Sequence, residues 1–190
     1  MAVAEFDELN ILEAEADKFV DNISTVIDDP NRSMIQGDIE DDLEDLLIMA
    51  YALGSDYARR VLGTDTEASA EEVREAVYRK IDDEDFKQLI RKHIEEGDLG
   101  MIKTVIRTET GRVYNEAVMD ISEDSGLDGI KKTWVTMGDA KVRDPHWALE
   151  GVTIPYKDEF YVGEDHAFQP CGFGVPELDC NCRCRLRISK

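Results

Sequence analysis

The chain has 190 residues, of which 43 are acidic and 22 are basic, so its formal net charge is −21. Hydrophobic residues make up 42% of it, enough for a core, but no run approaches the roughly 18 apolar residues that predict a membrane-spanning helix. The four cysteines, all in the C-terminal fifth, are too few for a disulfide-stabilised scaffold. We therefore expect one ordinary domain or a small pair, without membrane contact and of reducing, intracellular origin.

The excess of acid is concentrated in the first half of the chain. Residues 1–95 hold 26 acids and 10 bases, whereas residues 96–190 hold 17 and 12. At low salt such a surface repels itself and nucleic acid phosphates, but at molar salt the Debye length falls to about 3 Å and the repulsion is screened. Two interpretations stay open: a protein adapted to concentrated salt, and an ordinary solvated acidic helix surface.

The first two thirds of the chain have the pattern of helices. Apolar residues recur at spacings of three and four from Ile11 to Ile27 and again from Ile39 to Val61, with Asp38 as the expected cap of the second helix. We expect Gly63 to end that helix.

Three further helices are predicted from capping signals. Ser69 and Glu72 form a capping box, "DDEDF" begins a fourth helix that ends at Gly97, and Asp98 opens a fifth, whose apolar residues begin at Met101. Each of these signals is local, so we expect the helix boundaries to follow them.

The pattern changes after residue 130. The stretch "KKTWVTMGD" alternates and predicts a strand that ends at Gly138 and Asp139, and residues 181–188 alternate as well. Four of the five prolines lie in this part, so we expect short strands joined by turns. The predicted fold class is α+β, with a helical N-terminal part followed by a small β-rich C-terminal part. The predicted domains are a helical N-terminal region (1–97) and a C-terminal domain (98–190) that begins with the fifth helix.

Three of the four cysteines lie on alternate positions of the stretch "DCNCRCRL", residues 179–186. In a strand, Cys180, Cys182 and Cys184 would share one face about 6.6 Å apart, whereas zinc binds sulfur at about 2.3 Å, so two thiolates meet one metal only if the chain bends. A zinc site, reduced cysteines packed on one strand face and a disulfide such as Cys171–Cys180 all stay open. Further ligands would come from His146, His166 and Cys171.

Two polar motifs have structural and chemical interpretations. Asp139, Arg143 and His146 share one turn, where they could act as acid–base partners, but a polar network that holds a loop is the preferred interpretation. Arg107 and Glu109 are too close in sequence to face each other on a helix, so we expect them to bond different neighbours and to hold the helix against the β part. The basic C-terminal run could contact nucleic acid, an acidic partner or the chain's own acids; it comprises Arg183, Arg185, Arg187 and Lys190.

These motifs follow one another in an order that is typical of a known family. The pattern is Arg-Thr-Glu on a helix, a Trp strand, an Asp-x-x-x-Arg-x-x-His turn, Leu-x-Gly and a closing Asn-Cys-Arg-Cys. It is formed here by Arg107, Thr108, Glu109, Trp134, Asp139, Arg143, His146, Leu149, Gly151, Asn181, Cys182, Arg183 and Cys184. Residues 106–184 thereby resemble the phage Mu F-like head morphogenesis domain of minor head proteins of tailed viruses.

The resemblance implies a structural, non-enzymatic protein of the viral head that acts in head assembly or DNA delivery. The implied location is the capsid interior near the portal, after assembly in the host cytoplasm, with several copies per virion. The implied partners are the portal protein and other head proteins, with packaged DNA as a partner at high salt. The acid excess would fit a halophilic host.

The resemblance also bears on the cysteines. Some family members have Cys-x-x-Cys where this chain has Arg143-x-x-His146, which favours a metal site, with zinc as the metal. The candidate ligands are His146, Cys182, Cys184 and Cys180, with Cys171 or His166 as the alternative fourth ligand. Two alternatives from other classes are a metal-dependent hydrolase that uses His146 and the C-terminal cysteines, and a small zinc-containing nucleic-acid-binding module, which the net charge disfavours.

Overall fold

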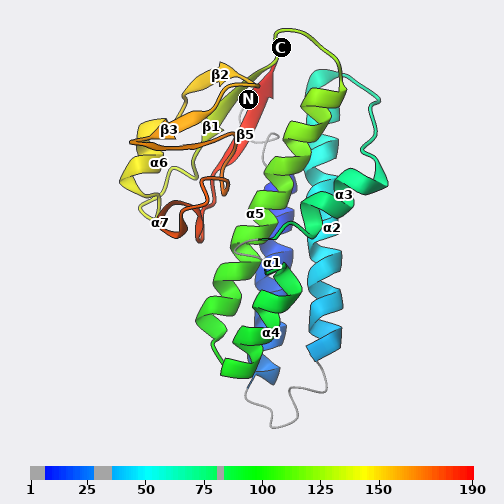
Figure 1. Ribbon diagram of the computed structural model, residues 1–190, viewed down its shortest axis with the longest axis vertical. Helices are drawn as coiled ribbons and strands as arrows, with labels where there is room; N and C mark the ends of the chain where they lie inside the picture. The colour runs from blue at the N-terminus through cyan, green and yellow to red at the C-terminus, as the bar shows by residue number, and fades with distance from the viewer. Residues whose placement is uncertain (1–6, 28–35, 81–83) are drawn as a thin grey trace.

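The computed structural model describes residues 7–27, 36–80 and 84–190 (Figure 1). Within these residues the chain forms seven helices and five strands, with the strands in the C-terminal part, which confirms the α+β class. The helices are α1 (Asp7–Val26), α2 (Gln36–Leu62), α3 (Ala70–Val77), α4 (Phe86–Glu96), α5 (Leu99–Asp124), α6 (Asp144–Leu149) and α7 (Pro176–Asp179). The strands are β1 (Lys131–Val135), β2 (Thr153–Pro155), β3 (Phe160–Val162), β4 (Asp165–Ala167) and β5 (Arg185–Ser189).

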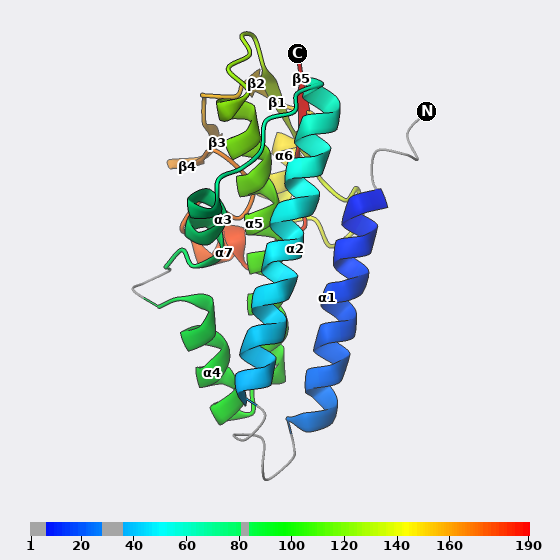
Figure 2. The same ribbon diagram turned by 90° about the vertical axis from the view of Figure 1, so that its right-hand side faces the viewer.

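The long helices α1, α2 and α5 run along the long axis of the molecule, and α3 and α4 pack against them (Figures 1 and 2). The most extensive packing is between α2 and α5. At their crossing a Cβ atom on Gly54 would lie 2.3 Å from the carbonyl oxygen of Tyr114, so only glycine allows this approach. Helix α5 therefore forms the centre of the fold, with helices on one side and the β part on the other.

Most of the predicted helix boundaries are confirmed. The capping box of Ser69 and Glu72 begins α3, Gly97 ends α4 with a φ of 71°, and the Asp98 carboxylate accepts from the Met101 amide at 3.0 Å at the start of α5. Gly63 follows α2 with a φ of 64°. These signals depend only on neighbours in sequence, which is why the sequence locates them.

Three helical details differ from the prediction. Asp38 does not cap α2, because that helix begins at Gln36 and places Asp38 in its first turn. Ile11 and Met101 are 50% and 39% exposed. Each precedes a buried residue, Leu12 or Ile102, and therefore lies about 100° around the helix from the packed face.

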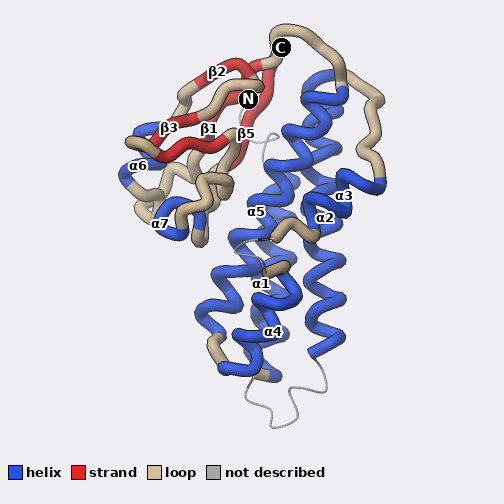
Figure 3. Tube along the Cα trace, in the orientation of Figure 1, coloured by secondary structure: helices blue, strands red, loops and turns tan. Residues whose placement is uncertain are grey.

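The three-stranded sheet is antiparallel, in the order β2-β1-β5, with Trp134 opposite Leu186 (Figure 3). Strand β1 ends at Val135, earlier than predicted, because the Thr136 amide bonds the Glu150 carboxylate at 2.6 Å instead of a strand. Strands β3 and β4 form a separate antiparallel pair.

The outer edge of β5 faces the helices. The amide of Leu186 donates to the Asn115 side chain of α5 at 2.9 Å, and the amide of Ile188 donates to the Tyr57 hydroxyl of α2 at 3.3 Å. Side chains thus satisfy backbone groups that an edge strand would expose. Buried residues of the helical and β parts form one hydrophobic cluster. The division between residues 97 and 98 stays a prediction, and none of the described helices has the length and apolarity to span a membrane.

Candidate metal site

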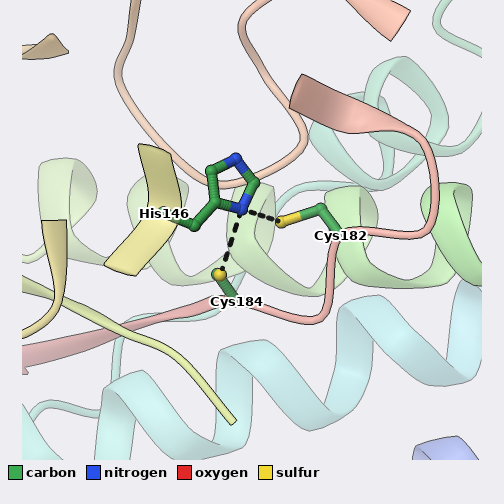
Figure 4. A group of neighbouring side chains, drawn as sticks. All are labelled: His146, Cys182 and Cys184. Atoms are coloured by element: carbon green, nitrogen blue, oxygen red, sulfur yellow. Dashed lines mark hydrogen bonds between the residues drawn. The ribbon is translucent and has the colours of Figure 1, made fainter. Parts of the chain in front are cut away.

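Three of the predicted ligands meet in the β part. His146 comes from α6, and Cys182 and Cys184 from the turn between α7 and β5 (Figure 4). The His146 Nδ1 atom lies 3.6 Å from the Cys182 sulfur and 3.5 Å from the Cys184 sulfur. The three ligand atoms all lie within 4.8 Å of one another, and all three residues are buried.

The two thiols converge because the chain bends before β5. Cys182 closes a turn through its amide, which donates to the Asp179 carbonyl at 3.0 Å, and Asn181 has a φ of 54°, a conformation that asparagine tolerates. The strand predicted from residue 181 is therefore wrong for residues 181–184, and β5 begins at Arg185. As geometry requires, two neighbouring thiols meet one histidine, and Cys180 does not join them.

Helix α5 holds this turn in place. The amide of Asn181 donates to the Thr108 hydroxyl at 2.9 Å, and the Asn181 side chain donates to the Thr104 hydroxyl at 3.0 Å. Asn115, 1% exposed, donates to the Cys184 carbonyl at 3.3 Å and accepts from the Leu186 amide. Helix α5 thus positions Cys184 through its carbonyl oxygen and Cys182 through the neighbouring Asn181.

Gly111 of α5 faces this turn, where an added Cβ atom would make ordinary van der Waals contacts. A Cβ atom on this residue would lie 3.4 Å from the Cys171 sulfur and 3.5 Å from the Cys182 carbonyl. Neither Gly111 nor Asn115 was singled out from the sequence. A glycine and an asparagine inside a strongly predicted helix, both poor helix formers, are the signal that could have identified them.

Aromatic rings enclose the histidine. Trp134 meets His146 edge to face at 5.5 Å between ring centroids, and Phe173 stacks on its ring at 6.3 Å with an interplanar angle of 21°. Within the described residues, the His146 Nε2 atom is buried without a partner. The Trp134 indole N–H likewise meets no nitrogen or oxygen acceptor there and faces the Cys184 sulfur, whose thiolate form it favours.

Hydrogen bonding within the cluster shifts the pKa values of its two thiols in opposite directions. Hydrogen bonds from Cys171, then Cys184 and then His146 hold the pKa of the Cys182 thiol far below its usual range, against the effect of burial. The bond to Cys182, followed by burial, raises the pKa of Cys184 far above it. The two pKa values are thus shifted in opposite directions, toward the thiolate at Cys182 and toward the thiol at Cys184, whereas a bound metal would take both as thiolates.

The other candidate ligands lie apart from this group. The Cys171 thiol forms a hydrogen bond with the Cys182 side chain and also donates to the Cys182 carbonyl at 3.6 Å. Cys171 is nevertheless not among the three residues whose ligand atoms lie within 4.8 Å of one another. Cys180 is half-buried, and His166 is exposed on β4, where it bonds Glu159 at 3.0 Å. All four cysteines are free, so a Cys171–Cys180 disulfide is not formed.

The polar motifs around the site form the expected structural network. Arg183 pairs with Asp139 at 2.6 Å, and Arg143 donates to the carbonyl oxygens of Leu178 and Cys180. These bonds join the loop after β1 to the turn before β5. One residue of the basic C-terminal run therefore pairs with an acid of the chain itself.

The helical motif meets only half of the expectation: its two charged residues bond different neighbours, but those partners lie on α1 and α5 and not in the β part. Arg107 pairs with Asp17 of α1 at 2.9 Å. Glu109 bonds Arg112 at 2.8 Å inside the protein, where Arg112 also donates to the Ala76 carbonyl at 2.7 Å. Arg107 and Glu109 thus bond different neighbours.

The donor set and its spacing fit zinc. Ligands at about 2.3 Å for sulfur and about 2.0 Å for nitrogen, at tetrahedral angles, lie about 3.5 Å apart from each other. The observed separations of 3.6 and 3.5 Å between nitrogen and sulfur match this value, although a thiol–imidazole hydrogen bond has the same length. The cluster could therefore hold a metal ion through one imidazole and two thiolates.

Comparison with known proteins gives one match. The family model described as "Phage Mu protein F like protein" matches residues 68–187, well over half of the chain. The match includes α5, the Trp134 strand and all three residues of the cluster. Comparison with the curated proteins and with the solved structures finds no match in either.

Proposed function

Since the chain belongs to the phage Mu protein F-like family, we propose that it is a minor head protein of a tailed virus that acts next to the portal, inside the capsid. The family match over residues 68–187 is the observation that carries the proposal, because this family suggests a role in head morphogenesis. In this proposal several copies assemble with the portal protein and other head proteins, and the protein catalyses no reaction.

The surface proposed to bind the portal or a neighbouring copy lies on the helices. Among the described residues of these helices, the exposed large apolar side chains are Ile11 on α1, Ile48 on α2 and Met101 on α5. Exposed apolar side chains are the candidate contacts of such an interface. The β part has exposed apolar residues too, among them Trp147 and Tyr161, and they provide a matched control.

Portal binding by the full chain tests this surface. We expect the double variant Ile48→Asp/Met101→Asp to lose most of its binding to purified portal protein, and Trp147→Asp/Tyr161→Asp to retain it. All four side chains are exposed, so the variants should fold alike. Loss of binding in Trp147→Asp/Tyr161→Asp alone would place the interface on the β part and contradict the proposal.

We propose that the cluster of His146, Cys182 and Cys184 binds zinc as a structural cross-link. The β part is small, and small folds often need a metal or another cross-link. Zinc would tie the turn before β5 to α6. Cys171 is the proposed fourth ligand, because it is buried and its thiol already forms a hydrogen bond with the Cys182 side chain. Cys180 is only half-buried and lies outside the group.

Metal analysis of protein purified without chelator tests the cross-link. We expect about one equivalent of zinc per chain, as one four-ligand structural site requires. Cys182→Ser should abolish binding, Cys171→Ser should weaken it, and Cys180→Ser should leave it unchanged. Zinc retained by Cys182→Ser, or none in the native chain, would contradict the proposal.

One observation favours the hydrolase as a second candidate. Three ligand atoms converge among the described residues, and catalytic zinc sites have three protein ligands and an open position. If Cys171 does not complete the site, the zinc-loaded chain should hydrolyse an activated ester, and His146→Gln should abolish that rate. No turnover by the zinc-loaded chain supports the structural site instead.

A further inference from the structure

A cavity of about 450 Å³ lies between α1, α5, the loop after β1 and the turn before β5. The Arg183–Asp139 pair joins that loop to that turn. Two acids of α1, Glu13 and Asp17, line it. Five bases line it as well, although the chain carries only 22 bases against 43 acids. They are Arg107, Lys141, Arg143, Arg183 and Arg185.

The carboxylates at this cavity do not balance its bases. Asp17 pairs with Arg107, and Asp139 at the rim pairs with Arg183. Arg143 instead donates to the carbonyl oxygens of Leu178 and Cys180, which carry no net charge. Lys141 is exposed at the rim, and its charge acts on Asp139. Five bases thus face the carboxylates of Glu13, Asp17 and Asp139, and a thiolate at Cys182, which also lines the cavity, still leaves positive charge in excess.

Two further residues affect the electrostatic potential in the cavity. Arg185 is 9% exposed, so its charge is screened by water less than that of a surface arginine. Glu13 faces the cavity from α1, and its charge acts on both Arg183 and Arg185. Glu13 is thus the internal competitor of any anion that enters.

We propose that this cavity binds a phosphate group. Guanidinium groups present planar pairs of N–H donors that match phosphate oxygens, and an excess of positive charge favours an anion of charge near −2 over a single carboxylate. The volume admits a phosphate together with the group that carries it. That group is a small molecule or the backbone of a nucleic acid, and the inference does not depend on the proposed head function.

Calorimetric titration of the full chain with inorganic phosphate, at constant ionic strength near 0.15 M, tests the site. We expect saturable binding, weakened about 3- to 10-fold by Lys141→Gln, because an opposite charge at the rim is lost. Glu13→Gln should tighten binding by a similar factor. Lys92→Gln, on the exposed side of α4, is the matched control and should leave binding unchanged.

Opposite shifts in the two cavity variants cannot come from a folding defect, which would only weaken binding. Absence of saturable phosphate binding, or equal binding by the native chain, Lys141→Gln and Glu13→Gln, would overturn the proposal. So would tighter binding of a glutamate peptide than of phosphate.

Two further titrations distinguish the phosphate sources. If a thymidine decanucleotide binds more tightly than phosphate and Lys141→Gln weakens both, the ligand is a nucleic acid backbone. If a nucleoside monophosphate binds with the same dependence on Lys141 and the decanucleotide does not, the ligand is a small phosphorylated molecule. Either result supports the phosphate site.

Discussion

Asn115→Ala should destabilise the whole C-terminal part without replacing a proposed metal ligand. The native side chain donates to the Cys184 carbonyl at 3.3 Å and accepts from the Leu186 amide at 2.9 Å, in a position that is 1% exposed. Alanine leaves both backbone groups buried without a partner, at about 1–3 kcal/mol each. We therefore expect the free energy of unfolding to fall by about 2–6 kcal/mol, a large share of the roughly 5–15 kcal/mol of a typical domain.

Urea unfolding followed by circular dichroism measures this loss, and hydrogen exchange at the Leu186 amide shows where it arises. Asn22→Ala on α1 is the matched control: its side chain is exposed, so the change should stay within about 0.5 kcal/mol. An Asn115→Ala variant that unfolds within 0.5 kcal/mol of the native chain, with unchanged protection of Leu186, would refute the reasoning.

Three more predictions concern charge. If the acid excess reflects a saline host, the thermal midpoint should fall as salt is lowered from molar to dilute, because 43 acids repel when unscreened; a flat or rising midpoint would refute it. Burial raises the pKa of Asp120 from 3.8 to about 6 against its bond to Tyr51, so native stability should fall from pH 3.8 to 6 relative to Asp120→Asn. At pH 7 the free energy of unfolding of Asp120→Asn should exceed that of the native chain by about 1–2 kcal/mol once solvent screening is discounted, and its urea midpoint should be higher. An equal or lower midpoint would contradict this. Burial lowers the pKa of Lys132 from 10.5 to about 8, so the native chain should gain stability relative to Lys132→Met between pH 8 and 10.5, and a constant difference would contradict it.

The parts of the fold that sequence predicts well are those set by near neighbours. The capping box at Ser69 and the glycine after α4 are examples, because each cap is completed within a few residues. The error at residues 181–184 has the opposite cause. The Asn181 amide bonds Thr108 of α5, more than seventy residues away, and this contact replaces the strand that alternation predicts.

The candidate site divides in the same way. Residue type and the family resemblance were enough to select His146, Cys182 and Cys184, which the structure brings together. They could not identify Asn115, because its role is to bond backbone atoms that only the folded chain brings near. The cationic cavity was equally hidden, since its bases come from α5, the loop after β1, the turn before β5 and the first residue of β5.

The most direct test of the head function is an electron cryomicroscopy map of the portal vertex in virions of the virus that encodes this chain. The account predicts density for its helices and small sheet inside the capsid, next to the portal, in several copies, with α1, α2 or α5 in contact with a partner. Virions without this density, or with the chain on the outer capsid surface, would contradict it.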